Sequence, residues 1–273
     1  MNKYLKNRNF IIGFIFLSII LILAFGGLFF KPYNPSQIDI ANKLQGFSRQ
    51  HILGTDHLGR DILSRLMVGS TISLEIGFFV VLFGALIGIP IGAIAGYYGG
   101  KIDEIIMKLI DTLMSFPGVL IALMLIAVFN VSLSIIILAL VLIALPKFAR
   151  ISRSGFYKYR ESPFVLATKA RGASSFRIML FHILPHLVPS LMVTASLTFA
   201  TAIISEAGLS YLGLGIQPPT PSFGKMVSEA QSYILQDPLY VFIPTLAITI
   251  LVLGFNLIGD GIQDISEKDK NNE

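Results

Sequence analysis

The chain has 273 residues, of which 54% are hydrophobic and 14% charged, with a formal net charge of +5. Its mean hydropathy of +0.75 excludes an ordinary soluble domain of this length. The absence of cysteine excludes a disulfide framework and a thiolate metal site. Inner loops of a membrane protein explain the charge better than nucleic-acid binding.

Six apolar stretches are long enough to cross a membrane as helices, for which about 20 residues suffice. They cover about 10–30, 72–98, 105–129, 131–149, 186–207 and 239–259. The first is too long for the apolar region of a signal peptide, and no A-x-A-like site precedes Lys31, so we expect a retained anchor. With the N-terminus inside, fifteen of the 21 Lys and Arg residues fall on inner segments, which predicts that both chain ends lie inside.

We expect one all-α membrane domain with two outer excursions. The second excursion, about 209–238, is rich in Gly and Pro and predicts an irregular cap outside the lipid. The expected divisions are 1–30 for the N-terminal end and first span, 31–70 for an extracytoplasmic segment, 71–262 for a core of five spans, and 263–273 for a cytoplasmic tail.

The second span carries a glycine at every fourth position, which puts a smooth groove on one helix face. The glycines are Gly84, Gly88, Gly92, Gly96 and Gly100. Such a groove lets another backbone approach closely, and Pro90 predicts a bend in the same helix. The pattern indicates either close helix packing or a moving, pore-lining helix.

An inner loop at about 150–185 predicts a helix, a glycine break and a second helix. Ser162 can cap the first helix, and Pro163 suits its first turn. Gly172 ends that helix, and Ser174 or Ser175 can cap the next. A short helix on the inner face of a membrane protein offers a surface on which a cytosolic partner can push.

Motifs of soluble or membrane enzymes are absent from the sequence. There is no G-x-x-x-x-G-K-[ST] loop, so any use of ATP energy requires a separate ATPase subunit. There is no H-E-x-x-H or G-x-S-x-G either, which disfavours a membrane protease or esterase. His182 and His186 share a helix face and could bind a metal, but Pro185 lies between them, and two interfacial histidines are the simpler interpretation.

Three acidic residues lie near membrane depth, where such groups usually face a partner or a wet cavity. They are Glu75, Asp111 and Glu206. Glu206 is the best candidate for a proton relay, because it lies where the fifth span meets the Gly- and Pro-rich outer segment. A structural or interfacial carboxylate is the alternative.

The inner loop resembles the cytoplasmic EAA loop of ABC-importer permeases, whose pattern is E-A-A-x-x-x-G followed by I-x-L-P. The matching positions read Leu166-Ala167-Thr168, then Gly172, then His182-Ile183-Leu184-Pro185. Leu166 stands where the family has glutamate, Thr168 replaces the second alanine and His182 the isoleucine. The glycine and the Leu-Pro pair keep the family's spacing.

Three further segments narrow the resemblance to the dipeptide/oligopeptide/nickel permeases, in their C-type subunit. Residues 53–61 read L-G-T-D-H-L-G-R-D, 209–221 read L-S-Y-L-G-L-G-I-Q-P-P-T-P, and 255–260 read F-N-L-I-G-D. These segments are similar to that family's signatures and occur in its order. The resemblance therefore covers nearly the whole chain from about residue 30 on.

This resemblance implies a type I importer permease of six spans, with both ends inside and a coupling helix between spans 4 and 5. It implies a non-catalytic subunit of a bacterial inner membrane, with no cofactor and no metal of its own. The implied partners are a related B-type permease, two ATPases that bind the ATP, and an extracytoplasmic substrate-binding protein. The implied solute is a small peptide, with nickel or a metal chelate as the alternative; an ion-driven secondary transporter is the alternative of another class.

Two groups of site residues follow from the resemblance. The small Ala167, Ala170 and Ala173 would let the loop seat closely in an ATPase groove, where Lys169 and Arg171 could meet acidic residues. The full coupling set is Pro163, Leu166, Ala167, Thr168, Lys169, Ala170, Arg171, Gly172, Ala173, Leu184 and Pro185. The expected contacts to the binding protein, or the outer gate, are Asp56, Arg60, Asp61, Glu206 and Gln217.

Overall fold

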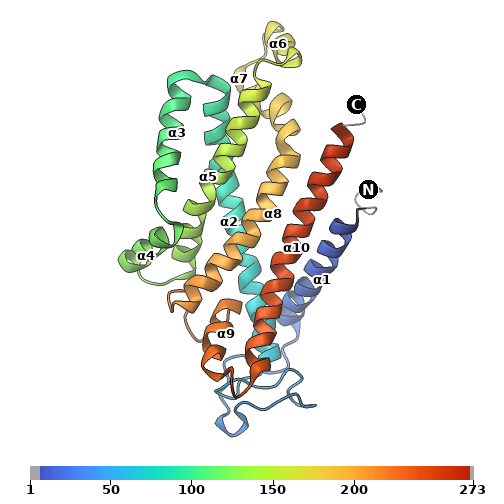
Figure 1. Cartoon of the computed structure of the whole chain (residues 1–273), viewed down its shortest axis with the longest axis vertical. Coiled ribbons are helices and arrows are strands. Elements are labelled where there is room, and N and C mark those ends of the chain that lie inside the picture. The colour runs from blue at the N-terminus through green and yellow to red at the C-terminus, as the bar shows by residue number, and fades with distance from the viewer. Residues whose placement is uncertain (1–6, 271–273) are drawn as a thin grey trace.

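The computed structural model describes residues 7–270, which form helices and loops without a strand (Figure 1). Lys3 and Lys6, counted in the orientation argument, lie outside the described residues, as does the end of the predicted tail at 271–273. The longer helices are α1 (Arg8–Phe29), α2 (Ile62–Tyr98), α3 (Gly100–Ser115), α4 (Gly118–Phe129), α5 (Leu133–Tyr159), α6 (Pro163–Ala170), α8 (Leu184–Tyr211), α9 (Phe223–Ala230) and α10 (Pro238–Lys270).

Five helices of the described chain are long and apolar enough to cross a membrane by themselves. The predicted third span, 105–129, is instead two helices, α3 and α4, which together qualify as a sixth span and are bent by 81°. The break falls at Phe116 and Pro117. Proline disfavours helical backbone in the residue before it, and Phe116 accordingly has φ −89° and ψ 133°.

Four spans are longer than their hydropathy predicts: α2, α5, the helix that contains α8, and α10, which runs to Lys270 rather than ending near 259. α2 begins at Ile62 rather than near 72, so the expected boundary at residue 70 falls inside this helix. α5 continues to Tyr159 rather than ending near 149. Lys147 and Arg150, counted above with the inner segments, therefore lie on a membrane-spanning helix. Its 27 residues extend over about 40 Å, so the inner end of α5 projects beyond a hydrocarbon core of about 30 Å.

The glycine groove of α2 packs against α5. A Cβ atom at Gly88, Gly92 or Gly96 would collide with backbone atoms of α5, so only glycine permits this approach. The contact also lets the Ser152 hydroxyl of α5 donate to the Ile89 carbonyl at 2.8 Å. The stripe is therefore a packing surface in this structure. Gly100 does not belong to it, because nothing lies within 4 Å of its Cβ position.

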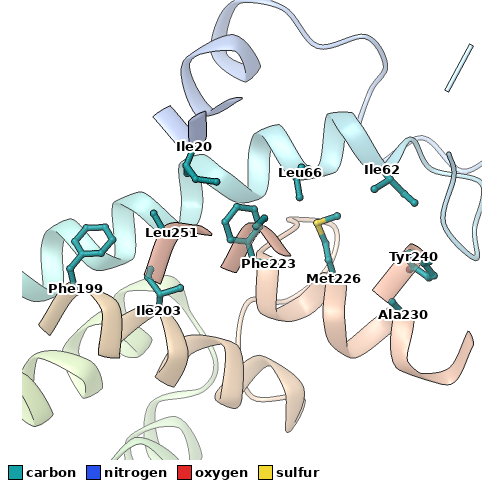
Figure 2. Packing of buried hydrophobic residues seen from close by; sticks show 11 residues of the cluster. Ile20, Ile62, Leu66, Phe199, Ile203, Phe223, Met226, Ala230, Tyr240 and Leu251 are labelled. Atoms are coloured by element: carbon teal, nitrogen blue, oxygen red, sulfur yellow. The ribbon is translucent and has the colours of Figure 1, made fainter. Parts of the chain in front are cut away.

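A second core joins α1, α2, α8, α9 and α10 near the outer side (Figure 2). Its largest buried side chains include Ile20, Ile62, Leu66, Phe199, Ile203, Phe223, Met226, Tyr240 and Leu251. The short helix α9 thus lies inside the bundle rather than on its surface. The beginning of α1 and the end of α10 lie toward the α6 end, and segment 31–61 lies at the opposite end (Figure 1). This arrangement agrees with an even number of spans.

Candidate coupling helix and outer ion-pair network

The inner loop forms the predicted helix, α6, with one correction at its start. Pro163 occupies the first turn as expected. The Ser162 hydroxyl does not cap the helix; it donates instead to the Tyr159 carbonyl at 2.6 Å. The reason is the tight turn out of α5, in which the Ser162 N–H also donates to the same carbonyl at 3.0 Å.

The glycine break ends α6 as predicted. Gly172 has φ +82°, a conformation that glycine adopts without steric cost. Its N–H donates to the Lys169 carbonyl at 3.0 Å, and the Ala173 N–H donates to the Thr168 carbonyl at 3.4 Å. This is a Schellman ending. The Ser174 hydroxyl then accepts from the Arg177 N–H at 3.4 Å and begins the next helix.

That next helix runs without interruption into the fifth span. α7 (Ser175–Arg177) continues through a π-helical turn, Ile178–Ile183, into α8, and the whole stretch Ser175–Tyr211 qualifies as one membrane-spanning helix. The predicted start of this span near 186 is therefore too late. π-helical turns are rare and occur frequently at functional sites.

One face of α6 is fixed to this helix and to α5. Val165 is 1% exposed and belongs to a cluster with Phe156, Ile178 and Ile183. The His186 ring packs against Phe164 at a centroid distance of 5.1 Å and stacks with Tyr159 at 5.5 Å. A displacement of α6 therefore acts directly on the start of α8.

The opposite face of α6 is open. Leu166 is 52% exposed, and the other exposed residues of the predicted coupling set are Pro163, Ala167, Lys169, Ala170, Arg171, Gly172 and Pro185. Thr168, Ala173 and Leu184 are half-buried. The structure thus gathers most of the predicted coupling residues on one accessible surface at the inner end.

At the outer end, Asp56 organises the turn between segment 31–61 and α2. One oxygen of its buried carboxylate accepts from the N–H groups of Leu58 at 2.8 Å and Arg60 at 2.9 Å. The other accepts from the Arg60 Nε at 2.5 Å. Gly59 takes φ +74° inside this turn, which explains the glycine of the motif.

The turn is part of an ion-pair network that reaches α9. The guanidinium groups of Arg60 and Arg65 both contact one oxygen of Glu229, at 2.7 and 2.8 Å. The Arg65 Nε lies 3.5 Å from Asp56. Two cations and two carboxylates thus meet in a largely buried site, where each charge needs its partners. The sequence analysis missed Arg65 and Glu229; their charges next to apolar segments were the available signal.

Two neighbouring groups complete this region. Asp61 caps α2 by accepting from the Ser64 N–H at 2.7 Å, and His51 Nδ1 lies 3.0 Å from its other oxygen. His57 Nδ1 lies 3.0 Å from the Tyr240 hydroxyl. Burial lowers the pKa of His57 below its ordinary value, although Asp56 and Glu229 oppose the shift. This histidine is therefore neutral at pH 7.

The last two predicted outer residues lie apart from the network. Glu206 is fully buried on α8, where one of its oxygens accepts from the hydroxyls of Ser210 at 2.7 Å and Ser222 at 2.8 Å. Ser222 also caps α9 by accepting from the Lys225 N–H, so Glu206 fixes the start of that helix. Gln217 is exposed, and its amide donates to the Gly213 and Gly215 carbonyls.

Residues 88–272 match the family described as binding-protein-dependent transport system inner membrane component. The chain belongs to this family. Residues 1–46 match the N-terminal TM domain of oligopeptide transport permease C. The chain is therefore a multi-pass transport permease subunit of the inner membrane, and membership of this family implies ATPase and substrate-binding partners in general.

Curated relatives cover nearly the same length. The chain is 39% identical to the dipeptide transport system permease protein DppC of Alkalihalophilus pseudofirmus, over 95% of this chain and 85% of that one. It is 37% identical to the glutathione transport system permease protein GsiD of Pectobacterium atrosepticum, over 96% and 87%. GsiD of Shigella sonnei is 41% identical over 92% and 83%.

The fold has a counterpart among solved structures. A chain of the MetNI methionine ABC transporter in an inward-facing conformation superimposes with a TM-score of 0.62 at 20% identity, covering 74% of this chain and 96% of that one. The predicted all-α type I importer permease fold and the predicted family are both confirmed.

Proposed function

We propose that this permease is the C-type subunit of an ATP-driven importer of small peptides. Support for the solute comes from the relatives, which are named for dipeptide and glutathione transport. We further propose that it pairs with a related B-type permease and that two ATPase subunits bind all of the ATP. In this proposal the chain itself needs no cofactor and no metal.

The observation that carries the proposal is the structure of α6, which has one exposed face and one face packed against the fifth span. Its exposed face would lie in a groove of one ATPase, where Ala167 and Ala170 allow close approach. Lys169 and Arg171 would meet carboxylates, each exposed pair contributing about 0–1 kcal/mol. Because Val165 fixes α6 to the continuous helix Ser175–Tyr211, closure of the ATPases would shift the populations of inward- and outward-facing states.

Leu166 gives this contact a particular chemistry. At the position of the family's glutamate it presents an apolar side chain that is 52% exposed. We expect the ATPase surface opposite Leu166 to be apolar, since a charged group there would be desolvated without a partner.

At the outer end we propose that Asp56, Arg60 and Asp61 act indirectly, through the local structure that they stabilise. These residues are at most 5% exposed, so they would shape the surface that the binding protein meets rather than touch that protein. Gln217, which is exposed, remains a candidate for direct contact.

The structure offers less support for the alternatives. Asp56, His57 and Glu229 hold ligand atoms close enough for a metal, but Arg60 and Arg65 already pair with both carboxylates, which disfavours a nickel site there. An ion-driven carrier would rely on Glu206, but the hydrogen bond of Glu206 to Ser222 has a structural role, because Ser222 caps α9.

Uptake by the purified complex in proteoliposomes tests the proposal. We expect dipeptide uptake that requires ATP, the ATPases and the binding protein, and we expect Ala167→Trp to abolish it together with ATPase copurification. The control Lys101→Trp, at an exposed inner position, should leave both intact. Uptake that persists without the ATPase subunits would overturn the proposal and favour an ion-driven carrier.

A further inference from the structure

Lys147 is a cation near the middle of a membrane-spanning helix. It lies on α5, and its ammonium group donates to the Thr201 hydroxyl of α8 at 3.2 Å. Among the described residues no carboxylate pairs with it. Ionisable residues at membrane depth are costly and usually face the bundle interior or a water-filled cavity, often along a solute pathway.

The direction of this side chain argues against anchoring at the inner surface. Gly155 and Leu187 lie at one level of the α5–α8 contact. With a rise of 1.5 Å per residue, Lys147 lies about 12 Å outward of this level, and Thr201 about 21 Å. The ammonium group therefore extends toward the outer side, whereas a lysine that anchors to the inner surface would extend inward.

Lys147 contributes to a small cavity between α5 and α8 that has both polar and apolar walls. The cavity, of about 30 Å³, is also lined by Thr198, Thr201 and Ser205. Thr198 is 2% exposed, and its buried hydroxyl has no hydrogen-bond partner among the described residues. A lysine ammonium offers three donors, and Thr201 accepts one of them. The unused ammonium donors of Lys147 beside a cavity of this size favour a small acceptor group, such as one end of a carboxylate.

The cavity continues a line of hydroxyl groups along α8. Ser190 and Thr194 line a larger cavity, of about 330 Å³, nearer the inner end. Their spacing of three or four residues to Thr198, Thr201 and Ser205 places all five on one side of the helix. A hydroxyl line along a membrane-spanning helix is suited to a wetted path rather than to lipid.

Lys147 differs from the neighbouring cation on α5 in having no ion-pair partner among the described residues. Arg150, one turn inward, is paired with Asp111 of α3 at 2.6 Å. Lys147 is thus the unbalanced charge of this part of α5.

We propose that the Lys147 ammonium group, held in place by the Thr201 hydroxyl, forms an anion subsite on the wall of the translocation path. Its ligand is the carboxylate of the peptide in transit. The identity of the solute rests on the proposed function; the anion subsite itself rests on the geometry. A peptide would exchange part of the hydration of its carboxylate for ammonium donors here, and would leave easily because only one charge attracts it.

The cysteine-free chain permits a direct test in the assembled transporter. Thr201→Cys is exposed to an anionic (sulfonate) and a cationic (trimethylammonium) methanethiosulfonate of similar size, with Lys147 intact or replaced by Gln or Arg. We expect the anionic-to-cationic rate ratio to fall about tenfold in Lys147→Gln, as Coulomb's law gives for one charge at about 5 Å in water. Lys147→Arg should preserve the ratio.

Two control positions bracket this measurement. Ile22→Cys, on the exposed side of α1, should react slowly with both hydrophilic reagents. Gln50→Cys, exposed in the outer segment, should react with a ratio that Lys147→Gln does not alter. A cysteine at 201 that is as unreactive as the one at 22, or a ratio that ignores Lys147, would overturn the subsite.

Protection experiments separate the solute from other anions. Dialanine should slow labelling at position 201, while dialanine amide and acetate at equal concentration should slow it less. Equal protection by acetate would overturn the assignment to the transported peptide. A charge effect at Lys147 in a transporter that takes up no peptide would refute the proposed function and leave the anion subsite standing.

Discussion

Removing the Glu229 carboxylate tests whether the outer network holds this end of the molecule together. In Glu229→Ala, Arg60 and Arg65 lose their shared carboxylate and keep Asp56 as their one carboxylate partner among the described residues. Both arginine side chains are at most 6% exposed, so one positive charge is left buried without compensation. Breaking a buried pair in this way costs about 3–5 kcal/mol, which lowers the unfolding temperature by roughly 6–20 °C for a chain of this size.

Thermal unfolding of the purified permease in detergent measures this loss. Glu161→Ala is the matched control, since Glu161 is 76% exposed and pairs with Arg160 at the surface; such pairs contribute about 0–1 kcal/mol. Hydrogen exchange should rise in α9 and in residues 53–61 of the Glu229 variant, with α6 unchanged. An unfolding temperature for Glu229→Ala within a degree or two of that for Glu161→Ala would refute the reasoning.

Three further changes probe the packing, the helix ending and the buried histidine. Gly92→Ala should cost about 1–3 kcal/mol in thermal unfolding, because its methyl group meets the Ala149 carbonyl; Gly46→Ala, with open space around it, should cost little, and equal losses would count against the groove. Gly172→Ala should destabilise the end of α6 by roughly 1–2 kcal/mol because of its φ of +82° and should reduce ATP-driven uptake more than it reduces folded yield; unchanged uptake would contradict that. The folded-state pKa of His57 lies below the unfolded value of 6.5, so its contribution to stability is complete above pH 6.5 and is lost as pH falls below that value. His57→Gln should therefore weaken the pH dependence of the unfolding temperature between pH 5 and 7. An unchanged pH dependence would refute this.

The elements that depend on local chemistry could be predicted from the sequence. Hydropathy located the spans, and the helix, glycine and helix of the inner loop followed from Pro163, Gly172 and Ser174 because caps and turns involve neighbouring residues. The break at Pro117 had a local signal as well, but the apolar run on both sides of it suggested one continuous span.

The outer network could not be predicted in the same way. Arg60 and Glu229 are 169 residues apart in the chain, and only the packing of α9 inside the bundle brings them together. The resemblance predicts Asp56 and Asp61 as contacts to the binding protein or as part of the outer gate. In the structure their side chains hold a turn and cap α2, functions that fix the positions of these residues while they stay buried.

Photo-crosslinking from α6 tests the central claim most directly. A benzophenone attached to Ala167→Cys, the single cysteine of that variant, is irradiated in membranes that contain the whole transporter, and the product is identified by mass spectrometry. The account predicts a crosslink to an ATPase subunit that changes in yield when ATP is bound, and none from the same probe at Gln50→Cys. A probe at 167 that crosslinks only to lipid, or to this chain alone, would contradict it.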